Sequence, residues 1–346
     1  MKAIRDFIAK SIRLAGPTFT ELPLSELSAA DTTLADGYGH LADRAILFHA
    51  LLTAAGFHPE FVLASELPPL TGITGVAKTF PLPQDFQYPM VKVVVAGQAY
   101  YLNDTDQYSQ LGATAHDGRL GLVLASRAST EIHAAKNCGN AMKTLYTLSV
   151  TDTGRTRVGV TRYYYGGGYG AKNHYFSELP PEERRRYFQE TVSQVAQGAR
   201  PVGGLTTKFD SYPGLEQFTV DVDNYAVVDG KYLYFDLPFT ASLFPVGDDH
   251  RVLPLFISQG SQETIRTEIT LPTDFHRIVI APQSERLAAP GGTAKITSTT
   301  TADQCVITDD LETTPAIIAP ADYPALLKVE SALRRKSAKV FLLEKE

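Results

Sequence analysis

The residue types that could do chemistry in this sequence include a cysteine and a histidine close together in the chain. Cys138 follows His133 by five positions in the stretch EIHAAKNCGNAM. A thiol beside an imidazole is the pairing that cysteine nucleophiles use, because the imidazole takes the proton of the thiol. A spacing of five residues does not by itself bring the two side chains together, so the sequence does not favour this dyad.

The most unusual local composition is TRYYYGGGYGAKNHYF, residues 161–176. Tyrosine rings can stack on sugars or on the apolar surface of a peptide, and glycines let a ligand approach the backbone. The alternative, which the sequence favours, is a hairpin loop that packs its tyrosines on the edge of a β-sandwich. The segment is still the best candidate binding surface. Its candidate residues are Tyr163, Tyr164, Tyr165 and Tyr169.

A third stretch, GYGHLADRAILFHALLTAAGF at residues 37–57, predicts a mostly buried helix. Apolar residues recur at helical spacing from residue 39 to residue 55, and a glycine follows that suits a left-handed helix cap. Near the helix start, Asp43 and Arg44 are expected to anchor the helix by hydrogen bonds or an ion pair. The alternative is that the same two side chains line a cleft.

The elements that must position these residues begin with residues 1–125. This part predicts a central helix against a small antiparallel sheet, with a short amphipathic helix at the start. A hairpin is expected within the sheet at residues 88–103, with its turn at 96–98. Proline and glycine dominate residues 67–85, which predicts a surface loop.

Residues 126–346 change in character. Short strands recur with turn residues between them, a pattern typical of a β-sandwich. Helices are expected near 178–198 and 321–337. The predicted fold class is therefore α+β: a papain- or transglutaminase-like core of one central helix against a small sheet, followed by a mainly-β sandwich domain.

Composition and charge exclude several function classes. The chain has 346 residues, of which 44% are hydrophobic and 20% charged, and its formal net charge of −6 argues against a nucleic-acid partner. No apolar run approaches the ~18 residues of a membrane helix. The first residues carry a charge every three or four positions, unlike a signal peptide. Cys138 and Cys305 belong to no CxxC pair, so we expect no metal site and no cofactor, and a disulfide between them stays open.

The first part resembles the transglutaminase-like superfamily, in particular bacterial multidomain proteins with a core flanked by β-sandwich domains. Those proteins have a Tyr-Gly-Asp-Cys-Lys-Asp-Lys-Ala motif at the start of a helix that continues Leu-Leu-x-Ala-Leu-Leu-x-x-Ala-Gly. The corresponding stretch here is YGHLADRA at residues 38–45, followed by ILFHALLTAAGF. The family's histidine strand, hairpin and aspartate strand correspond to FQYPMVKVVVAGQAYYLNDT at residues 86–105.

The resemblance implies three positions for a cysteine nucleophile, a histidine base and an orienting aspartate. In this sequence they are Leu41, Tyr88 and Asn103. Leucine has no nucleophilic atom, and tyrosine, with a pKa near ~10, is a poor base at neutral pH. Asparagine has no histidine to orient. The replacement of all three predicts that catalysis at this site is lost.

The sequence therefore predicts a catalytically inactive transglutaminase-like protein that binds a peptide or a glycan or has a structural role. The alternative is a cysteine hydrolase or acyltransferase of the same type that uses rearranged residues, with Cys138 as its thiol. The resemblance implies a periplasmic or cell-surface location and a chain shorter than its relatives, whereas the chain without a signal peptide would stay in the cytoplasm. The sequence does not specify the oligomeric state.

Overall fold

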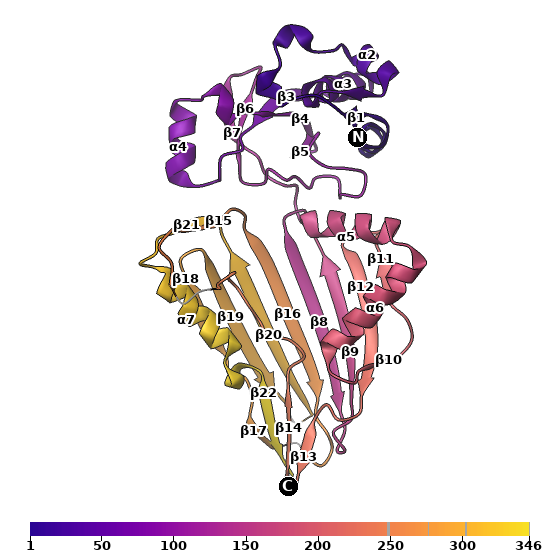
Figure 1. Ribbon diagram of the computed structural model, residues 1–346, viewed down its shortest axis with the longest axis vertical. Coiled ribbons are helices and arrows are strands. Elements are labelled where there is room, and N and C mark those ends of the chain that lie inside the picture. The colour runs from indigo at the N-terminus through magenta and orange to yellow at the C-terminus, as the bar shows by residue number, and fades with distance from the viewer. Residues whose placement is uncertain (248–249, 276, 302, 346) are drawn as a thin grey trace. The chain divides into compact units, whose positions relative to one another are not determined.

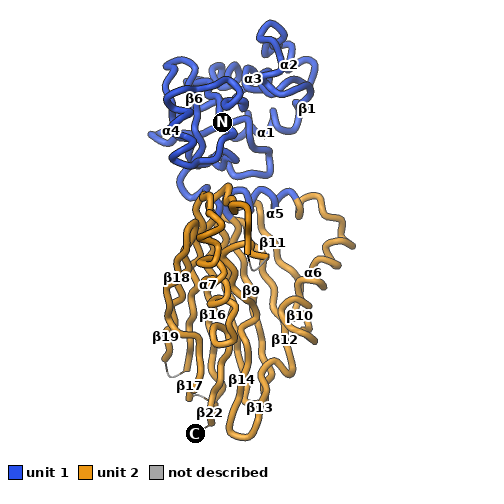
Figure 2. The backbone as a smooth tube through the Cα atoms, turned by 60° about the vertical axis from the view of Figure 1, so that its left-hand side comes forward, with its two compact units in different colours: residues 1–140, 165–174 blue, residues 141–164, 175–346 orange. Residues whose placement is uncertain are grey.

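The computed structural model describes residues 1–247, 250–275, 277–301 and 303–345. The chain divides into two compact units, coloured separately in Figure 2. Unit 1 comprises residues 1–140 and 165–174, and unit 2 comprises residues 141–164 and 175–346. The chain therefore leaves unit 1, returns to it once, and leaves it again.

Unit 1 is built on an antiparallel sheet of five strands in the order β5-β4-β3-β6-β7. The strands are β3 (Glu60–Ala64), β4 (Tyr88–Val95), β5 (Gln98–Leu102), β6 (Leu120–Val123) and β7 (Ala128–Glu131). The expected hairpin at 88–103 is present, because β4 and β5 pair across a tight turn in which Ala96 and Gly97 both have positive φ. The expected boundary near residue 125 is wrong, since it separates β6 from its partner β7.

Helix α3 (Leu41–Ala54) packs on this sheet and beside α1 (Lys2–Ser11) and α2 (Ala30–Asp36). One apolar cluster joins these helices to the hairpin, and its fully buried members include Ile8, Phe48, Leu52, Val91 and Leu102. Unit 1 also contains short elements: β1 (Arg13–Leu14), its parallel partner β2 (Tyr38–Gly39), and the 3-10 turns η1 (Phe19–Glu21), η2 (Leu24–Glu26) and η3 (Pro83–Asp85).

Two segments that the sequence assigned to loops are helical. The stretch 67–85 contains α4 (Thr71–Thr79), which buries Ala77 against Phe86 and Leu120. The tyrosine- and glycine-rich stretch contains α5 (Gly166–Glu178) and not the expected hairpin loop. Tertiary packing outweighs the low helix propensity of glycine in both helices.

Contacts within unit 1 hold the first part of α5. Asn173 Nδ2 donates to the Tyr108 carbonyl at 2.7 Å, and the rings of Tyr108 and His174 stack with their centroids 4.4 Å apart. A Cβ on Gly170 would lie 2.8 Å from Ser109 Oγ. A side chain at this position would therefore crowd Ser109.

Unit 2 contains a large sheet of nine strands, which run side by side in Figure 1. Its order is β10-β12-β9-β8-β16-β20-β19-β18, with β11 also pairing β12, and every pair is antiparallel except β8 with β16. The strands are β8 (Ala141–Val150), β9 (Thr156–Tyr164), β10 (Arg200–Pro201), β11 (Thr206–Lys208), β12 (Gly214–Val222), β16 (Ser261–Thr270), β18 (Glu285–Ala289), β19 (Gly292–Thr300) and β20 (Gln304–Thr313).

Smaller elements accompany this sheet. A second sheet has the order β13-β14-β22-β17, and β15 pairs with β21. These strands are β13 (Val227–Asp229), β14 (Tyr232–Asp236), β15 (Leu255–Ile257), β17 (Arg277–Ile280), β21 (Ala316–Ile318) and β22 (Val340–Glu344). The helices expected near 178–198 and 321–337 are present as α6 (Pro181–Val195) and α7 (Tyr323–Arg334), the latter followed by the 3-10 turn η4 (Lys336–Ala338).

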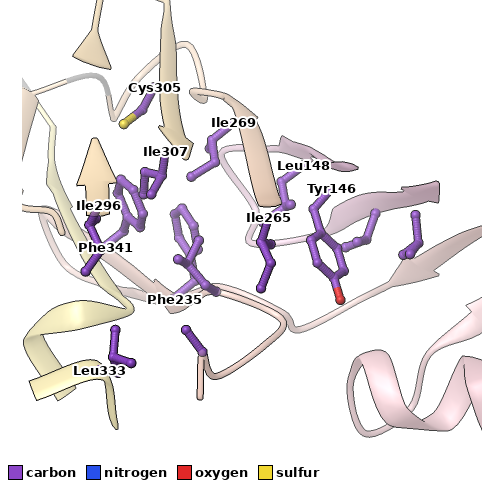
Figure 3. Close-up of a cluster of buried hydrophobic side chains, with 14 of the residues drawn as sticks. Tyr146, Leu148, Phe235, Ile265, Ile269, Ile296, Cys305, Ile307, Leu333 and Phe341 are labelled. Carbon is purple, nitrogen blue, oxygen red and sulfur yellow. The ribbon is translucent and has the colours of Figure 1, made fainter. Parts of the chain in front are cut away.

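One hydrophobic core joins the two sheets of unit 2 and α7. Phe235 of β14 stacks on Phe341 of β22 with the ring centroids 5.1 Å apart. Figure 3 shows these rings beside Ile269 and Ile307 of the large sheet, and Leu333 of α7 belongs to the same cluster. With helices and sheets in both units, the chain is α+β, as the sequence predicts. In the described part of the chain, no helix has the length and apolar character needed to cross a membrane.

The Glu330 carboxylate of α7 is 3% exposed and holds the chain that leads away from β14. It accepts the backbone N–H groups of Leu243 at 2.6 Å and Phe244 at 2.7 Å, and it pairs with Arg334 at 3.0 Å. We expect Glu330→Ala to destabilise unit 2 by about 3 kcal/mol, because it leaves buried donors without an acceptor. Thermal unfolding followed by circular dichroism measures this. Glu182→Ala, which removes an exposed carboxylate, is the control; equal effects of the two variants would contradict the prediction.

Asp309 of β20 is a second buried carboxyl group, and its pKa is raised to about 7 by burial and by the charges of Asp310 and Glu263. A pKa raised by folding adds stability below the unfolded value and loses it as the pH rises through the folded value. Asp309→Asn should therefore raise the free energy of unfolding by about 2 kcal/mol or more at pH 8.5 and change it little at pH 4. Denaturant titrations at both pH values test this against exposed Asp229→Asn. An equal effect at both pH values would be inconsistent with the raised pKa.

Candidate functional site

The start of helix α3 is fixed by His40 and Asp43. The His40 Nδ1 accepts the N–H of Ala42 at 3.2 Å, and its Nε2 lies 2.6 Å from the Pro17 carbonyl, which fits the tautomer protonated at Nε2. The two Asp43 carboxylate oxygens accept the N–H groups of His40 and Ser28, each at 2.8 Å. Asp43 is 4% exposed. It therefore anchors the first turn of the helix, and both its oxygens are occupied.

The three positions that the resemblance predicts for a catalytic triad, Leu41, Tyr88 and Asn103, lie next to one another. Asn103 Nδ2 donates to the Leu41 carbonyl at 2.9 Å and to the Pro89 carbonyl at 2.8 Å. The Tyr88 hydroxyl donates to the Asn103 carbonyl at 3.1 Å. Asn103 is 2% exposed and has a φ of 101°, a left-handed conformation that asparagine tolerates better than most residues. The carboxamide thus ties the first residue of α3 to strand β4.

Tyr88 lies at the centre of a polar cluster. Burial and the nearby Asp104 carboxylate raise the pKa of Tyr88 to about 12, and the positive charge of Arg44 opposes that shift. The Tyr88 ring also packs on His116, with the ring centroids 4.6 Å apart. The phenol is therefore protonated at neutral pH and serves as a hydrogen-bond donor, not as a base.

His116 is the member of this cluster that the sequence did not predict. It is 4% exposed; its Nδ1 lies 3.5 Å from Asp104 Oδ2 and its Nε2 lies 3.1 Å from Glu66 Oε1. Glu66 Oε2 also accepts Arg119 Nη1 at 3.0 Å. Asp104, His116 and Arg119 lie in the segment between β5 and β6, whereas Glu66 lies fifty residues before His116, and their spacing matches no known motif. The only available signal was that Asp104 directly follows Asn103.

An imidazole between two carboxylates has the form of a base with its orienting group, but both ring nitrogens of His116 face carboxylates. Within the described residues, no cysteine, serine or threonine side chain hydrogen-bonds to this ring. Nucleophilic catalysis needs such a contact to activate the attacking atom. The cluster therefore lacks a nucleophile–base pair.

Three polar atoms around Tyr88 have unmet hydrogen-bonding capacity. Arg44 is 8% exposed, and its buried Nε has no partner among the described residues. Asn103 Oδ1 and Asp104 Oδ1 are likewise buried without a donor in the described part of the chain. Burial lowers the pKa of Arg44, and Tyr88 opposes that shift. Such a group of unsatisfied atoms can accept a polar ligand or water.

The four candidate tyrosines do not share one exposed face. Tyr164 is 7% exposed and its hydroxyl donates to Glu216 at 3.2 Å, whereas Tyr163, the next residue of β9, is 37% exposed. Tyr169 is 6% exposed within α5, and Tyr165, between the strand and the helix, is partly buried. Two of the four are thus packed inside the protein. Their role in binding stays a prediction.

Cys138 does not have the surroundings of a reactive thiol, because it is buried and His133 faces other residues. Cys138 is 6% exposed, and its sulfur lies 3.8 Å from the Leu111 carbonyl. The His133 side chain is 64% exposed, and its ring nitrogens lie within 4 Å of Asp117 and Glu131 carboxylates. No disulfide joins Cys138 to Cys305. Within the described ranges, no three His, Cys, Asp or Glu side chains are grouped to hold a metal ion.

Comparisons with known proteins support the fold. Residues 231–343 match the family DUF3858, described as a domain of unknown function with a solved structure. No curated protein matches the chain. The structure is similar to a crystal structure described as that of a "putative protease" from Parabacteroides distasonis ATCC 8503, with 14% sequence identity and a TM-score of 0.51. The alignment covers 99% of this chain and 50% of that chain, so this chain spans about half the length of its structural neighbour.

Asn103→Asp introduces the residue type that the resemblance implies for an active triad, and we expect it to destabilise unit 1 by about 2–4 kcal/mol. A carboxylate oxygen would then face the carbonyls of Leu41 and Pro89, to which the amide now donates. Thermal unfolding measures the change. Asn137→Asp is a matched control, because Asn137 also has a positive φ, of 65°, but is exposed. If both variants have the same unfolding temperature, the carboxamide does not have this anchoring role.

Proposed function

We propose that this chain is a non-catalytic protein of the transglutaminase-like type, in which unit 1 binds a peptide or a glycan. One observation carries the proposal. Leu41, Tyr88 and Asn103 adjoin at the start of helix α3, in the arrangement expected of an inherited triad, but carry no thiol, imidazole or carboxylate. Attack on an amide carbonyl needs a nucleophile and a base, and these three side chains supply neither.

The hydrogen bonds of the site support a structural use of the inherited positions. The Asn103 amide is occupied by two backbone carbonyls, and the Tyr88 hydroxyl is occupied by the Asn103 carbonyl. An orienting group in a catalytic triad instead directs its acceptor at the histidine. The structural neighbour described as a protease supports the fold of this proposal, and the activity in that description refers to the neighbour alone.

A binding role is supported by the polar atoms that the fold leaves unsatisfied. Arg44 Nε, Asn103 Oδ1 and Asp104 Oδ1 are buried around Tyr88, and none has a hydrogen-bond partner in the described part of the chain. A purely architectural site would be expected to pair such groups, because each one left unpaired lowers stability. A ligand with donors and acceptors would satisfy them.

The proposal predicts no turnover by the purified chain in two assays: amine incorporation into glutamine peptides and hydrolysis of peptides. Leu41→Cys alone should also be inactive, because the neighbouring Tyr88 is a donor and cannot take the thiol proton at neutral pH. Alkylation of the new thiol by iodoacetamide, followed by mass spectrometry, checks that it is present and accessible. Turnover by the unmodified chain at a rate that scales with protein concentration would refute the proposal.

A further inference from the structure

We infer that Arg44 binds a carboxylate group of a peptide ligand, so that the ligand of unit 1 is a peptide with a free C-terminus or an acidic side chain. This inference rests on the proposed binding function and specifies the chemistry of its ligand. It starts from the buried guanidinium of Arg44, which makes no ion pair with any carboxylate among the described residues. Arginine is rarely buried unless an anion accompanies it.

The other charged groups near Arg44 already have partners. Asp43 is occupied by two backbone N–H groups. Glu66 pairs with Arg119 and faces His116. Asp104 Oδ2 accepts the N–H of Ala115 at 2.9 Å as well as a threonine hydroxyl. Arg44 is therefore the one cation of this cluster, within the described chain, whose counter-charge the protein does not supply.

Arg44 lies on helix α3 close to Leu41 and Tyr88, two of the three positions proposed as an inherited triad. Arg44 and Leu41 are three residues apart on the helix, so they share one face. The Leu41 carbonyl is held by Asn103, and the electrostatic coupling between Arg44 and Tyr88 puts the guanidinium near the phenol. Tyr88 is half-buried and the Glu66 side chain is 54% exposed, so the cluster reaches the protein surface.

The remaining unsatisfied polar atoms favour a peptide carboxylate over a phosphate as the ligand of Arg44. Asn103 Oδ1 and Asp104 Oδ1 are acceptors that need donors, whereas Arg44 Nε is a donor that needs an acceptor. A peptide presents N–H groups close to a carboxylate and can satisfy both kinds. A dianionic phosphate monoester presents only acceptors, and its second charge would be repelled by the Asp104 carboxylate. A carboxylate also matches the planar, two-donor edge of a guanidinium.

A structural role for Arg44 makes the opposite prediction for stability. If the guanidinium is an unpaired buried charge kept for a ligand, Arg44→Gln should leave the unfolding temperature of the free protein unchanged or raise it by a few degrees. Arg13→Gln, at an exposed arginine of the same unit, is the control. A fall in the unfolding temperature of the Arg44 variant, without a fall in the control, would overturn the inference. The same measurement verifies that the variant is folded for the binding assays.

The binding experiment compares matched peptide pairs on the full chain. N-acetyl-trialanine as the free acid is titrated against its C-terminal amide, and N-acetyl-Ala-Glu-Ala-amide against N-acetyl-Ala-Gln-Ala-amide. Calorimetry gives the affinities, and the Nε–Hε resonance of Arg44, assigned by its loss in Arg44→Lys, reports contact with the guanidinium. We expect at least one acid to bind about tenfold or more tightly than its neutral partner and to shift this resonance. Which pair shows the difference distinguishes a C-terminal from a side-chain carboxylate.

Arg44→Gln should remove the preference for the acid, and Arg13→Gln should retain it. Equal affinities within both pairs, or a preference for the acid that survives Arg44→Gln, would overturn the inference. The absence of binding by either acid at 10 mM would also overturn it, because a complex with a millimolar Kd is detected at that concentration. Binding of a neutral oligosaccharide in place of the acids would overturn the inference but retain the proposed function. Enzymatic turnover would overturn the proposed function, whichever result Arg44 gives.

Discussion

A buried carboxamide makes the hydrogen-bonded connection between helix α3 and strand β4 of unit 1. Asn103 stands at the end of the β4–β5 hairpin and donates from one nitrogen to a carbonyl at the start of α3 and to a carbonyl in β4. Both acceptors are backbone carbonyls, one in the first turn of α3 and one in β4. Because a helix and a strand meet at one side chain, the register between them is specified by hydrogen bonds as well as by apolar packing. Apolar side chains such as Phe48 and Val91 then fill the space that this connection defines.

The proposed function assigns to this position the orienting carboxylate of a catalytic site. A carboxylate accepts hydrogen bonds and orients an imidazole, whereas a carboxamide in its place can donate to carbonyls. Under the proposed function, the exchange of carboxylate for carboxamide turns this group from a reaction partner into a connection between elements. Tyr88 follows the same logic, because burial keeps its phenol protonated and its hydroxyl donates to the backbone of Asn103. Residues that keep their places can therefore serve stability alone.

Local patterns predicted the elements whose apolar periodicity is strong. Helix α3 and the β4–β5 hairpin follow from spacing and turn chemistry, as do α6 and α7. Helices α4 and α5 did not, because their glycines lower helix propensity and only tertiary contacts, such as the packing of Gly170 on Ser109, compensate for this. The His116 cluster was also missed. Glu66 meets the segment 104–119 only in the folded chain, and the spacing of Asp104, His116 and Arg119 within that segment matches no motif.

Two buried charges, Glu330 in unit 2 and Arg44 in unit 1, differ in their hydrogen-bond partners. This difference supports unit 1 as the place where a ligand binds. In unit 2, Glu330 is surrounded by donors, as expected of a group that holds a chain segment in place. In unit 1, Arg44 is also buried but has no counter-charge among the described residues. Selection for stability alone would remove such a charge, since an apolar or neutral side chain of similar size costs less to bury. A buried arginine beside two unsatisfied acceptors is better explained by a partner that supplies the missing carboxylate than by the fold itself.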